Sequence, residues 1–270
     1  MQYDPIKRSL GTVFNNKPVL RKIFYNLLDL LLLRAWHIKK ELREWARKAP
    51  QQSAVLDAGA GFGQYVYFLS KLSHGAQITG VDVKQEQIDD CNNFFGKIGR
   101  ADKVQFEYAD LTKFRKDNSY DLIISVDVME HIEEDIAVFR NFAASLKKGG
   151  MLLISTPSDM GGSDVHHDHE DGFVDEHVRD GYSRDDIKLK LAAAGFKNIT
   201  AKYSYGWPGN ISWKLSMKYP ILMLNASKLL FIILPFYYIV VFPFAFILNC
   251  IDLHVSNSAG TGLIVKAYKA

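Results

Sequence analysis

The sequence is poor in cysteine, and it contains no internal repeat or low-complexity tract. Cys91 and Cys250 are the two cysteines among 270 residues, far apart and without metal-site spacing. This excludes a disulfide framework and fits a reducing compartment. A secretory signal is not expected either, because the apolar run at 27–33 is short, contains Asp29 and leads into Arg34.

The sequence also has little excess of either charge, since its net charge is +3. The charged residues are nevertheless unevenly distributed along the chain. Residues 1–50 hold 11 Lys and Arg against 4 Asp and Glu, a net of +7, which leaves −4 for the remainder. A basic arm on a mildly acidic body suggests an anionic surface as partner. Nucleic acid is not expected, because no aromatic-interleaved basic strand accompanies the arm.

The basic arm is expected to be helical over residues 18–48. An apolar face precedes a strongly basic stretch. The face comprises Ile23, Leu27, Leu30, Leu31 and Trp36, and the basic residues are Lys39, Lys40, Arg43, Arg47 and Lys48. Such a helix could lie on a membrane surface. Alternatively, it could cover the core and leave its charged end in solvent.

From residue 53 onward, predicted strands and helices alternate along the chain. The predicted strands cover residues 53–57, 77–83, 103–108, 120–126, 151–156, 198–204 and 261–268. The predicted helices cover residues 64–72, 85–95, 132–146 and 183–194, the last capped by Ser183 and ended by Gly195. Alternation with continuously apolar strands predicts an α/β fold with a parallel sheet covered on both faces.

A glycine-rich turn follows the first predicted strand, in residues 55–63 (VLDAGAGFG). The strand ends in Asp57, and Gly59, Gly61 and Gly63 follow at alternate positions. Glycine lets the backbone turn sharply and approach a ligand, and the next helix directs its N-terminus there. The dinucleotide fingerprint spaces its glycines as G-x-G-x-x-G. The tighter spacing here, with an acid in front, disfavours a diphosphate and suits an ammonium group.

Acidic residues also end the next three predicted strands. Asp82 ends the second strand and is placed to accept both ribose hydroxyls of a nucleoside. Asp110, followed by Leu111, ends the third strand and could meet an adenine amino group. Asp127 ends the fourth strand. Ligands bind at this carboxyl edge in open α/β sheets.

Five segments in order resemble motifs of the class I S-adenosylmethionine-dependent methyltransferases. They are residues 55–63, 80–83, 108–111, 120–132 and 147–150, and 120–132 resembles the subgroup with the ubiquinone-pathway enzymes. The resemblance implies a Rossmann-like, doubly wound seven-stranded sheet whose last strand lies antiparallel between the fifth and sixth. A dehydrogenase or a degenerate Rossmann domain is the alternative.

The resemblance also implies S-adenosyl-L-methionine as cofactor and assigns positions to its binding. The implied cofactor-binding residues are Asp57, Gly59, Ala60, Gly61, Gly63, Asp82, Val83, Asp110, Leu111, Asp127 and Val128. The methyl group on a sulfonium is already activated. The enzyme therefore has mainly to align the acceptor and exclude water, with a base where the acceptor is a hydroxyl.

Two features are candidates for the acceptor side. Asp127, Glu130 and His131 would share one face of a helix by their i, i+3 and i+4 spacing. They could bind a divalent metal, although no metal is predicted, because in many relatives a Glu-His pair only shapes the pocket. His131 is also a candidate catalytic residue.

The second feature is the loop at residues 158–182, which holds half of the eight histidines. Its spacing matches no standard zinc motif and no cysteine joins it. It could be a lid that supplies a base or orienting group, or a solvated polar loop. The catalytic candidates it contributes are His166, His169 and His177.

A long apolar insertion separates the last two predicted strands. Residues 229–248 are twenty residues without charge, about 30 Å as a single helix, which is the thickness of a bilayer core. The flanking strands should pair in one sheet, so the insertion must return to the side from which it leaves. Pro235 and Pro243 are also expected to break a single straight helix. We therefore expect a shallow re-entrant hairpin or an interfacial helix pair, or else a cap or dimerisation element packed on residues 18–36.

The sequence thus predicts four parts. They are an amphipathic basic arm (1–50), an S-adenosylmethionine-binding methyltransferase core (51–204), an apolar membrane-contacting or cap insertion (205–258) and a final core strand (259–270). The predicted function is methyl transfer to an O or N nucleophile of a lipid or lipophilic small molecule. The enzyme would be peripheral or monotopic on the cytoplasmic side of a membrane. The alternatives are a soluble small-molecule methyltransferase with a hydrophobic pocket or dimer interface, and a non-catalytic membrane-bound scaffold. The oligomeric state is left open.

Overall fold

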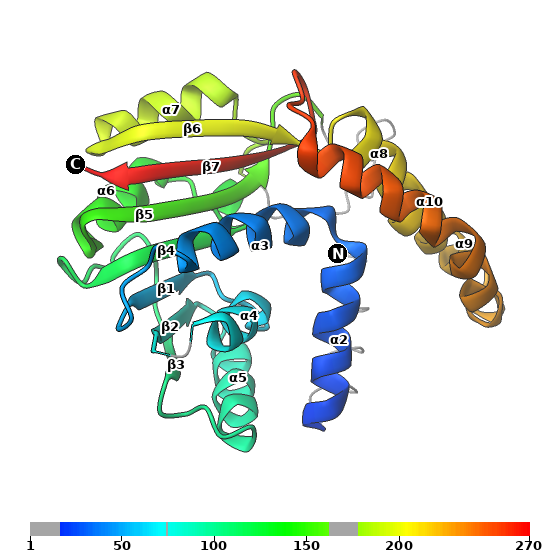
Figure 1. Cartoon of the computed structure of the whole chain (residues 1–270), viewed down its shortest axis with the longest axis horizontal. Coiled ribbons are helices and arrows are strands. Elements are labelled where there is room, and N and C mark those ends of the chain that lie inside the picture. The colour runs from blue at the N-terminus through cyan, green and yellow to red at the C-terminus, as the bar shows by residue number, and fades with distance from the viewer. Residues whose placement is uncertain (1–16, 74, 162–177) are drawn as a thin grey trace.

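A seven-stranded sheet forms the centre of the computed structural model, which describes residues 17–73, 75–161 and 178–270 (Figure 1). The strand order is β3-β2-β1-β4-β5-β7-β6. The strands are β1 Ala54–Ala58, β2 Gln77–Asp82, β3 Val104–Tyr108, β4 Tyr120–Val126, β5 Leu146–Pro157, β6 Phe196–Ser204 and β7 Gly262–Lys269. β7 pairs antiparallel with β5 and with β6, and the other neighbouring pairs are parallel. The predicted doubly wound sheet with an inserted antiparallel last strand is confirmed.

The central strands are apolar on both faces because helices cover both sides of the sheet. In β4, Leu122, Ile123 and Ile124 are all fully buried. Leu122 and Ile124 belong to the core shared with α3, α4 and α5, and Ile123 belongs to the core shared with α6 and α7. These helices are α3 Leu33–Ala46, α4 Gln64–Leu72, α5 Gln85–Lys97, α6 Asp135–Ser145 and α7 Arg184–Ala193. A parallel sheet buried on both faces reads as a continuous apolar run, as observed.

The N-terminal arm forms two helices, so the prediction of one helix was wrong. α2 spans Pro18–Leu31 and α3 begins at Leu33, and Leu32 between them is extended, with φ −95° and ψ 107°. Buried side chains on one face of α3 pack into the core, because Ala35, Ile38 and Leu42 recur at helical spacing. Residues 33–46 are therefore a core helix.

Part of the basic stretch is engaged in contacts within the chain. Lys39 is buried and forms an ion pair with Asp29. Lys40 Nζ donates to the carbonyl of Leu253, at 3.0 Å. These two lysines tie α3 to α2 and to the insertion, so neither is a free surface charge.

The helix predicted over residues 132–146 is shorter than expected. A 3-10 turn spans Met129–His131, and α6 begins only at Asp135. β5 begins at Leu146, because that residue is extended and pairs with Tyr120 of β4. The predicted Ser183 cap of α7 is confirmed by a bond from the Asp186 N–H to Ser183 Oγ, at 3.0 Å.

The insertion forms a helical hairpin that projects from the edge where β6 ends (Figure 1). Its outward limb comprises α8 Trp207–Trp213, a π-helix at Lys214–Lys218 and α9 Tyr219–Ala226. A 3-10 turn at Lys228–Ile232 precedes α10, which returns over Leu234–His254. The predicted return to the starting edge is confirmed, because β6 and β7 are neighbours in one sheet.

The prolines act on α10 less than predicted. Pro235 lies in the first turn, where its missing N–H costs no helical bond. Pro243 lies inside the helix, which nevertheless continues to His254, so the prediction that it breaks the helix was wrong. Its cost is one backbone bond. α10 packs against α8 next to this proline, where Ser212 Oγ donates to the Ala245 carbonyl, at 2.9 Å.

The carboxylate of Asp252 joins this hairpin to the core. Asp252 is fully buried near the end of α10, and its Oδ1 lies 2.9 Å from His37 Nε2 on α3. Its Oδ2 accepts the backbone N–H groups of Gly206, at 2.8 Å, and Gly209, at 3.3 Å, which begin α8. Asn257 Nδ2 also donates to Oδ2, at 3.1 Å. One side chain therefore caps α8, closes the hairpin and fastens it to α3.

We expect Asp252→Ala to lower the free energy of unfolding by about 3 kcal/mol or more, because several buried donors would lose their shared acceptor. Denaturant unfolding followed by circular dichroism measures this loss. The matched control is Asp185→Ala, since that carboxylate is exposed on α7, and it should change stability by less than about 0.5 kcal/mol. Equal stability of the two variants would contradict the anchoring role.

Candidate active site

The glycine loop between β1 and α4 is built on three left-handed glycines. Gly59, Gly61 and Gly63 have φ values of +81°, +50° and +71°. The N–H groups of Gly59 and Ala60 each donate to the carbonyl of Val81 in β2, at 2.9 Å. These bonds hold the loop against the carboxyl ends of β1 and β2, where it faces the segment that follows β4.

Gly59 also leaves room that no other residue would leave. A Cβ built on Gly59 would lie 2.3 Å from Cγ2 of Val128. The side chain of Val128 therefore forms one wall against the loop, and glycine is required for both the space and the backbone conformation. This close approach suits the cradle predicted for a small ligand.

Asp57 is a buried acid with unused bonding capacity. It is 2% exposed, and its Oδ2 has no hydrogen-bond partner within the described part of the chain. Burial, and secondarily the nearby charge of Asp82, raise the pKa of Asp57 to about 8. A buried, unpaired carboxyl of this kind is stabilised by a cation. It fits the ammonium or sulfonium of S-adenosylmethionine, as the sequence predicts.

Asp82 lies at the end of β2, beside the glycine loop. Its Oδ2 accepts the N–H of Gly61 at 2.9 Å, and its Oδ1 accepts the N–H of Lys84 at 3.0 Å. Each oxygen keeps a lone pair for a further donor. The two bonds fix the carboxylate at the mouth of the loop, in the position predicted for a ribose-binding acid.

The predicted adenine segment follows β3 at the same edge. Asp110 Oδ1 accepts the N–H and the hydroxyl of Thr112, at 2.9 and 2.7 Å, and these bonds lower the pKa of Asp110. Leu111 is buried, whereas Val83 is exposed at the end of β2. The segment is thus fixed by a local turn, and its role toward adenine stays a prediction.

A polar cluster surrounds Asp127 at the end of β4. Asp127 has a left-handed backbone, with φ +54°, and forms an ion pair with Arg34 at the start of α3. The N–H of Arg34 donates to the hydroxyl of Tyr205, at 3.1 Å. The buried hydroxyl of Tyr65 has no partner within the described residues, and burial raises its pKa, with smaller effects from the charges of Arg34 and Asp127. Two helices and two strand ends therefore meet at one acidic and phenolic site.

Glu130 faces this cluster from the 3-10 turn after β4. It is 1% exposed and accepts a bond from the Thr156 hydroxyl, at 3.2 Å. Burial, followed by the negative charge of Asp127, raises the pKa of Glu130 to about 8. It is therefore a proton acceptor or donor near neutral pH, if a ligand reaches it.

The predicted common helical face of Asp127, Glu130 and His131 is not formed. Asp127 precedes the turn, Glu130 points inward, and His131 is exposed. Within residues 17–73, 75–161 and 178–270, no group of three His, Cys, Asp or Glu side chains is placed to hold a metal ion. The other candidate histidines, His166, His169 and His177, lie outside the described residues.

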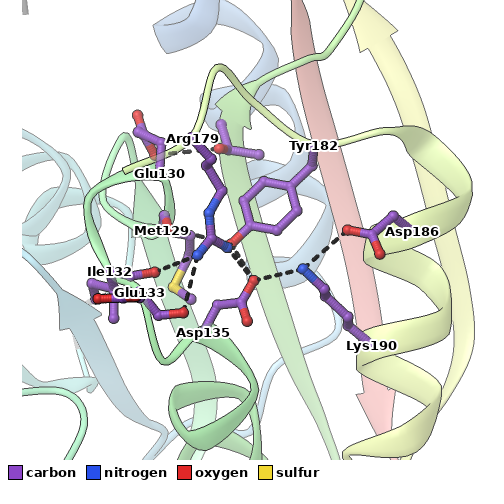
Figure 2. A network of polar contacts seen from close by, with 10 residues as sticks. Met129, Glu130, Ile132, Glu133, Asp135, Arg179, Tyr182, Asp186 and Lys190 are labelled. Carbon is purple, nitrogen blue, oxygen red and sulfur yellow. Dashed lines mark hydrogen bonds and ion pairs between the residues drawn. The ribbon is translucent and has the colours of Figure 1, made fainter. Parts of the chain in front are cut away.

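A network centred on Asp135 braces the turn that carries Glu130 (Figure 2). Asp135 Oδ2 accepts from Tyr182, at 2.8 Å, from Lys190, at 2.9 Å, and from Arg179. Arg179 also donates to the carbonyl of Ile132, at 2.7 Å. The segment before α7 therefore holds residues 129–135 in place from one side.

The glycine loop has a second brace that sequence reasoning missed. Arg21 of α2 is 2% exposed, and its Nη2 donates to the carbonyl of Phe62, at 3.0 Å. The hydroxyl of Tyr25 donates to the same carbonyl. Arg34, Tyr65 and Tyr205 were missed as well, because they come from three distant segments and no local spacing links them.

The model of a protein family described as "Methyltransferase domain" matches residues 28–201 of this chain. The match thus covers the sheet up to β6 and stops before the hairpin.

Curated relatives match only in part. Phosphoethanolamine N-methyltransferase 1 of Triticum aestivum is 32% identical over 152 residues, which are 55% of this chain and 29% of that protein. A ubiquinone biosynthesis O-methyltransferase of Coxiella burnetii is 33% identical over 103 residues, which are 38% of this chain and 42% of that protein. The chain therefore matches less than half the length of either relative.

Solved structures share the fold at low identity. Phosphoethanolamine N-methyltransferase 2 of Haemonchus contortus, in complex with S-adenosyl-L-methionine, has a TM-score of 0.58 at 18% identity. That alignment covers 91% of this chain and 60% of that one. The cyclase SpnF has a TM-score of 0.57 at 18% identity, covering 85% and 80%. The second case illustrates that this fold also hosts other chemistry.

We expect Gly59→Ala to weaken S-adenosylmethionine binding at least about tenfold, because its methyl group would displace Val128 and distort the loop. Isothermal titration calorimetry measures the dissociation constant. Gly149→Ala is the matched control, since Gly149 has φ +75° and nothing within 4 Å of a built Cβ. It carries the same backbone strain away from the site. An unchanged dissociation constant for Gly59→Ala would contradict the placement of the cradle.

We also expect S-adenosylmethionine affinity to rise between pH 6 and 8 in the wild type. Asp57 has a folded pKa of about 8 against 3.8 ordinarily, so a bound cation favours its ionised form and binding releases a proton. In the absence of ligand, the effect of Asp57 on the free energy of unfolding changes with pH in the opposite direction. The stability contributed by the protonated form is complete below about pH 4 and is lost as the pH rises to about 8. Titrations at both pH values measure the affinity, and Asp57→Asn should flatten the rise. A pH-independent wild type would refute this role.

Proposed function

This chain belongs to the methyltransferase domain family, and on that premise we propose that its acceptor is a lipid or lipophilic small molecule taken from a membrane surface. The chain is an S-adenosylmethionine-dependent methyltransferase. The relatives named above act on phosphoethanolamine and in ubiquinone biosynthesis. An acceptor with an N or O nucleophile is therefore the natural expectation for this chain as well.

S-adenosylmethionine supplies an activated methyl group on its sulfonium. Asp57 provides the buried negative charge for that cation, and Asp82 offers its free lone pairs to ribose hydroxyls. On the other side of the loop, Glu130 and the Asp127–Arg34 pair would meet the acceptor. Glu130 is suited to hold the proton that an O or N nucleophile loses.

The observation that carries the proposal is the inverted packing of the hairpin. Its interior is mostly small and polar, with Gly209, Ser212, Ser216, Ala245 and Asn249 buried, and Leu234 is the large apolar side chain buried with them. Its outer surface is large and apolar, with Leu229, Phe231, Ile232, Phe236, Ile239, Val240, Phe244 and Ile247 exposed. Helices in contact with lipid pair through small and polar residues and direct their apolar side chains outward. A helix pair in water has the opposite arrangement.

Hydrogen bonds inside the hairpin agree with this inversion. The hydroxyls of Tyr237 and Tyr238 on α10 donate to the carbonyls of Leu215 and Ser216, at 2.7 and 2.8 Å. Both carbonyls lie in the π-helix, where the regular pattern of backbone bonds is interrupted. In lipid, each backbone polar group needs such a partner within the protein.

The extent of the apolar surface also favours contact with a membrane. α10 is the single helix within the described ranges that is long and apolar enough to cross a bilayer. Only 17% of its most apolar 18-residue stretch is buried. Because β6 and β7 are paired, the hairpin would enter from one side and return to it. This supports a monotopic or peripheral attachment, and the two free cysteines fit the cytoplasmic side.

The position of the hairpin connects attachment to chemistry. Tyr205, the residue after β6, contacts Arg34 in the polar cluster around Asp127, where the acceptor would bind. α8 begins two residues after Tyr205. The hairpin therefore starts at the edge of the sheet that carries Asp57 and Asp127. An acceptor held in the bilayer surface beside α8 would need only a short movement to reach the cluster.

We expect the wild type to float with vesicles and to place the methyl group of labelled S-adenosylmethionine in an organic extract of membranes. Ile239→Ser with Val240→Ser should weaken vesicle binding at least about tenfold and reduce that labelling. Leu189→Ser is the control, because Leu189 is equally exposed but lies on α7. A wild type that stays out of the vesicle fraction, or that labels only water-soluble products, would overturn the proposal.

A further inference from the structure

Helix α2 has two apolar faces, and only one of them packs on the protein. The inner face buries Tyr25 and Arg21 and packs Phe24 and Leu28 on the core. The outer face exposes a stripe of four apolar side chains at positions i, i+4, i+8 and i+11. They are Val19, Ile23, Leu27 and Leu30, between 41% and 65% exposed.

The inner face contacts the donor loop directly. Arg21 and Tyr25 both donate to the carbonyl of Phe62, which stands between Gly61 and Gly63. Arg21 Nη1 donates to the carbonyl of Asp90 on α5, at 3.1 Å, and its Nε donates to Tyr25 Oη, at 2.8 Å. The guanidinium of Arg21 is thereby a bridge between α2, the glycine loop and α5.

We propose that α2 is a second bilayer-contact element, whose outer stripe binds the membrane and whose inner face thereby stabilises the donor loop. This inference rests on the proposed function, because it assumes that the protein works at a membrane. It adds a regulatory link, namely that S-adenosylmethionine binds more tightly when the chain is on a bilayer.

The stripe fits a bilayer surface for three reasons. A continuous apolar face on a helix that is already packed on its other side suits insertion at a membrane interface. Lys17 and Lys22 accompany the stripe, and these charges complement anionic lipid. The C-terminal end of α2 adjoins α3 near the sheet edge from which the hairpin projects (Figure 1). The hairpin and α2 can therefore approach one membrane.

The link to donor binding follows from how α2 is attached. Leu32 is extended, so α2 is not a continuation of α3. A 14-residue helix is marginal on its own in water, and α2 is held by the Phe62 contacts and by Asp29, which pairs with Lys39 and accepts from Gln64 Nε2, at 2.7 Å. A bilayer that binds the outer face favours the docked helix and hence the braced loop. Binding free energies are reciprocal, so donor binding should also strengthen vesicle binding.

The test is calorimetric titration of S-adenosylmethionine into the full chain, with and without saturating vesicles of equal parts phosphatidylglycerol and phosphatidylcholine. We expect the dissociation constant to fall roughly fivefold or more on vesicles. Ile23→Ser with Leu27→Ser should keep the solution value and lose this tightening, even at vesicle concentrations where the hairpin keeps the protein bound.

Two further variants separate the coupling from simple attachment. Ile239→Ser with Val240→Ser should need more vesicles but show the full tightening once bound. Tyr25→Phe, which removes one donor to the Phe62 carbonyl, should weaken donor binding in solution and reduce the tightening. Circular dichroism shows whether each variant is folded.

The outcomes distinguish the inference from the function on which it rests. A wild type that binds vesicles with an unchanged donor dissociation constant would overturn the inference and leave the proposed function standing. A wild type that binds no vesicles would overturn both. If Ile23→Ser with Leu27→Ser lowered the unfolding midpoint but left the tightening intact, another part of the chain would cover the stripe, and the inference would be wrong.

Discussion

The buried carboxylate of Asp252 is the constraint on which the arrangement of this protein depends. It collects the start of α8, the end of α10 and His37 of α3 in one set of bonds. A carboxylate without water is costly unless donors surround it, so these elements are held together as a unit. Because Arg34, which pairs with Asp127, lies in the first turn of α3, the same bonds fix the apolar hairpin relative to the proposed site.

The two halves of the proposed site, one for the methyl donor and one for the acceptor, differ in how they are held. The donor half is made by backbone, through the glycine loop and the bonds from Gly59 and Ala60 to Val81, and it is braced from outside by α2. The acceptor half is made by side chains from distant segments, around the Asp127–Arg34 pair and Glu130. Buried acids with raised pKa values occur in both halves, so the protein without ligand holds protons near neutral pH that a cationic donor would displace.

The sheet and the glycine loop with its neighbouring strand-end acids could be predicted from the sequence, because local patterns determine them. The apolar strands, the glycine spacing and the acids at strand ends each lie within a few consecutive residues. The acceptor half could not, since Arg34, Tyr65 and Tyr205 meet only through the tertiary fold. The break at Leu32 was missed because the apolar pattern continues across it, and the effect of Pro243 was overestimated, since α10 packs on α8 beside it and continues to His254. The return of the hairpin was predictable from topology alone.

The proposed function requires the hairpin to lie in lipid beside the site of methyl transfer. The most direct measurement uses vesicles that contain a phospholipid with a photoreactive group in its acyl chain, followed by mass spectrometric mapping of the adducts. The outward face of α10, between Phe236 and Ile251, should carry adducts, and α7 should carry none. Adducts confined to α7, or absent from α10 when the protein is vesicle-bound, would contradict the proposed contact between the hairpin and lipid.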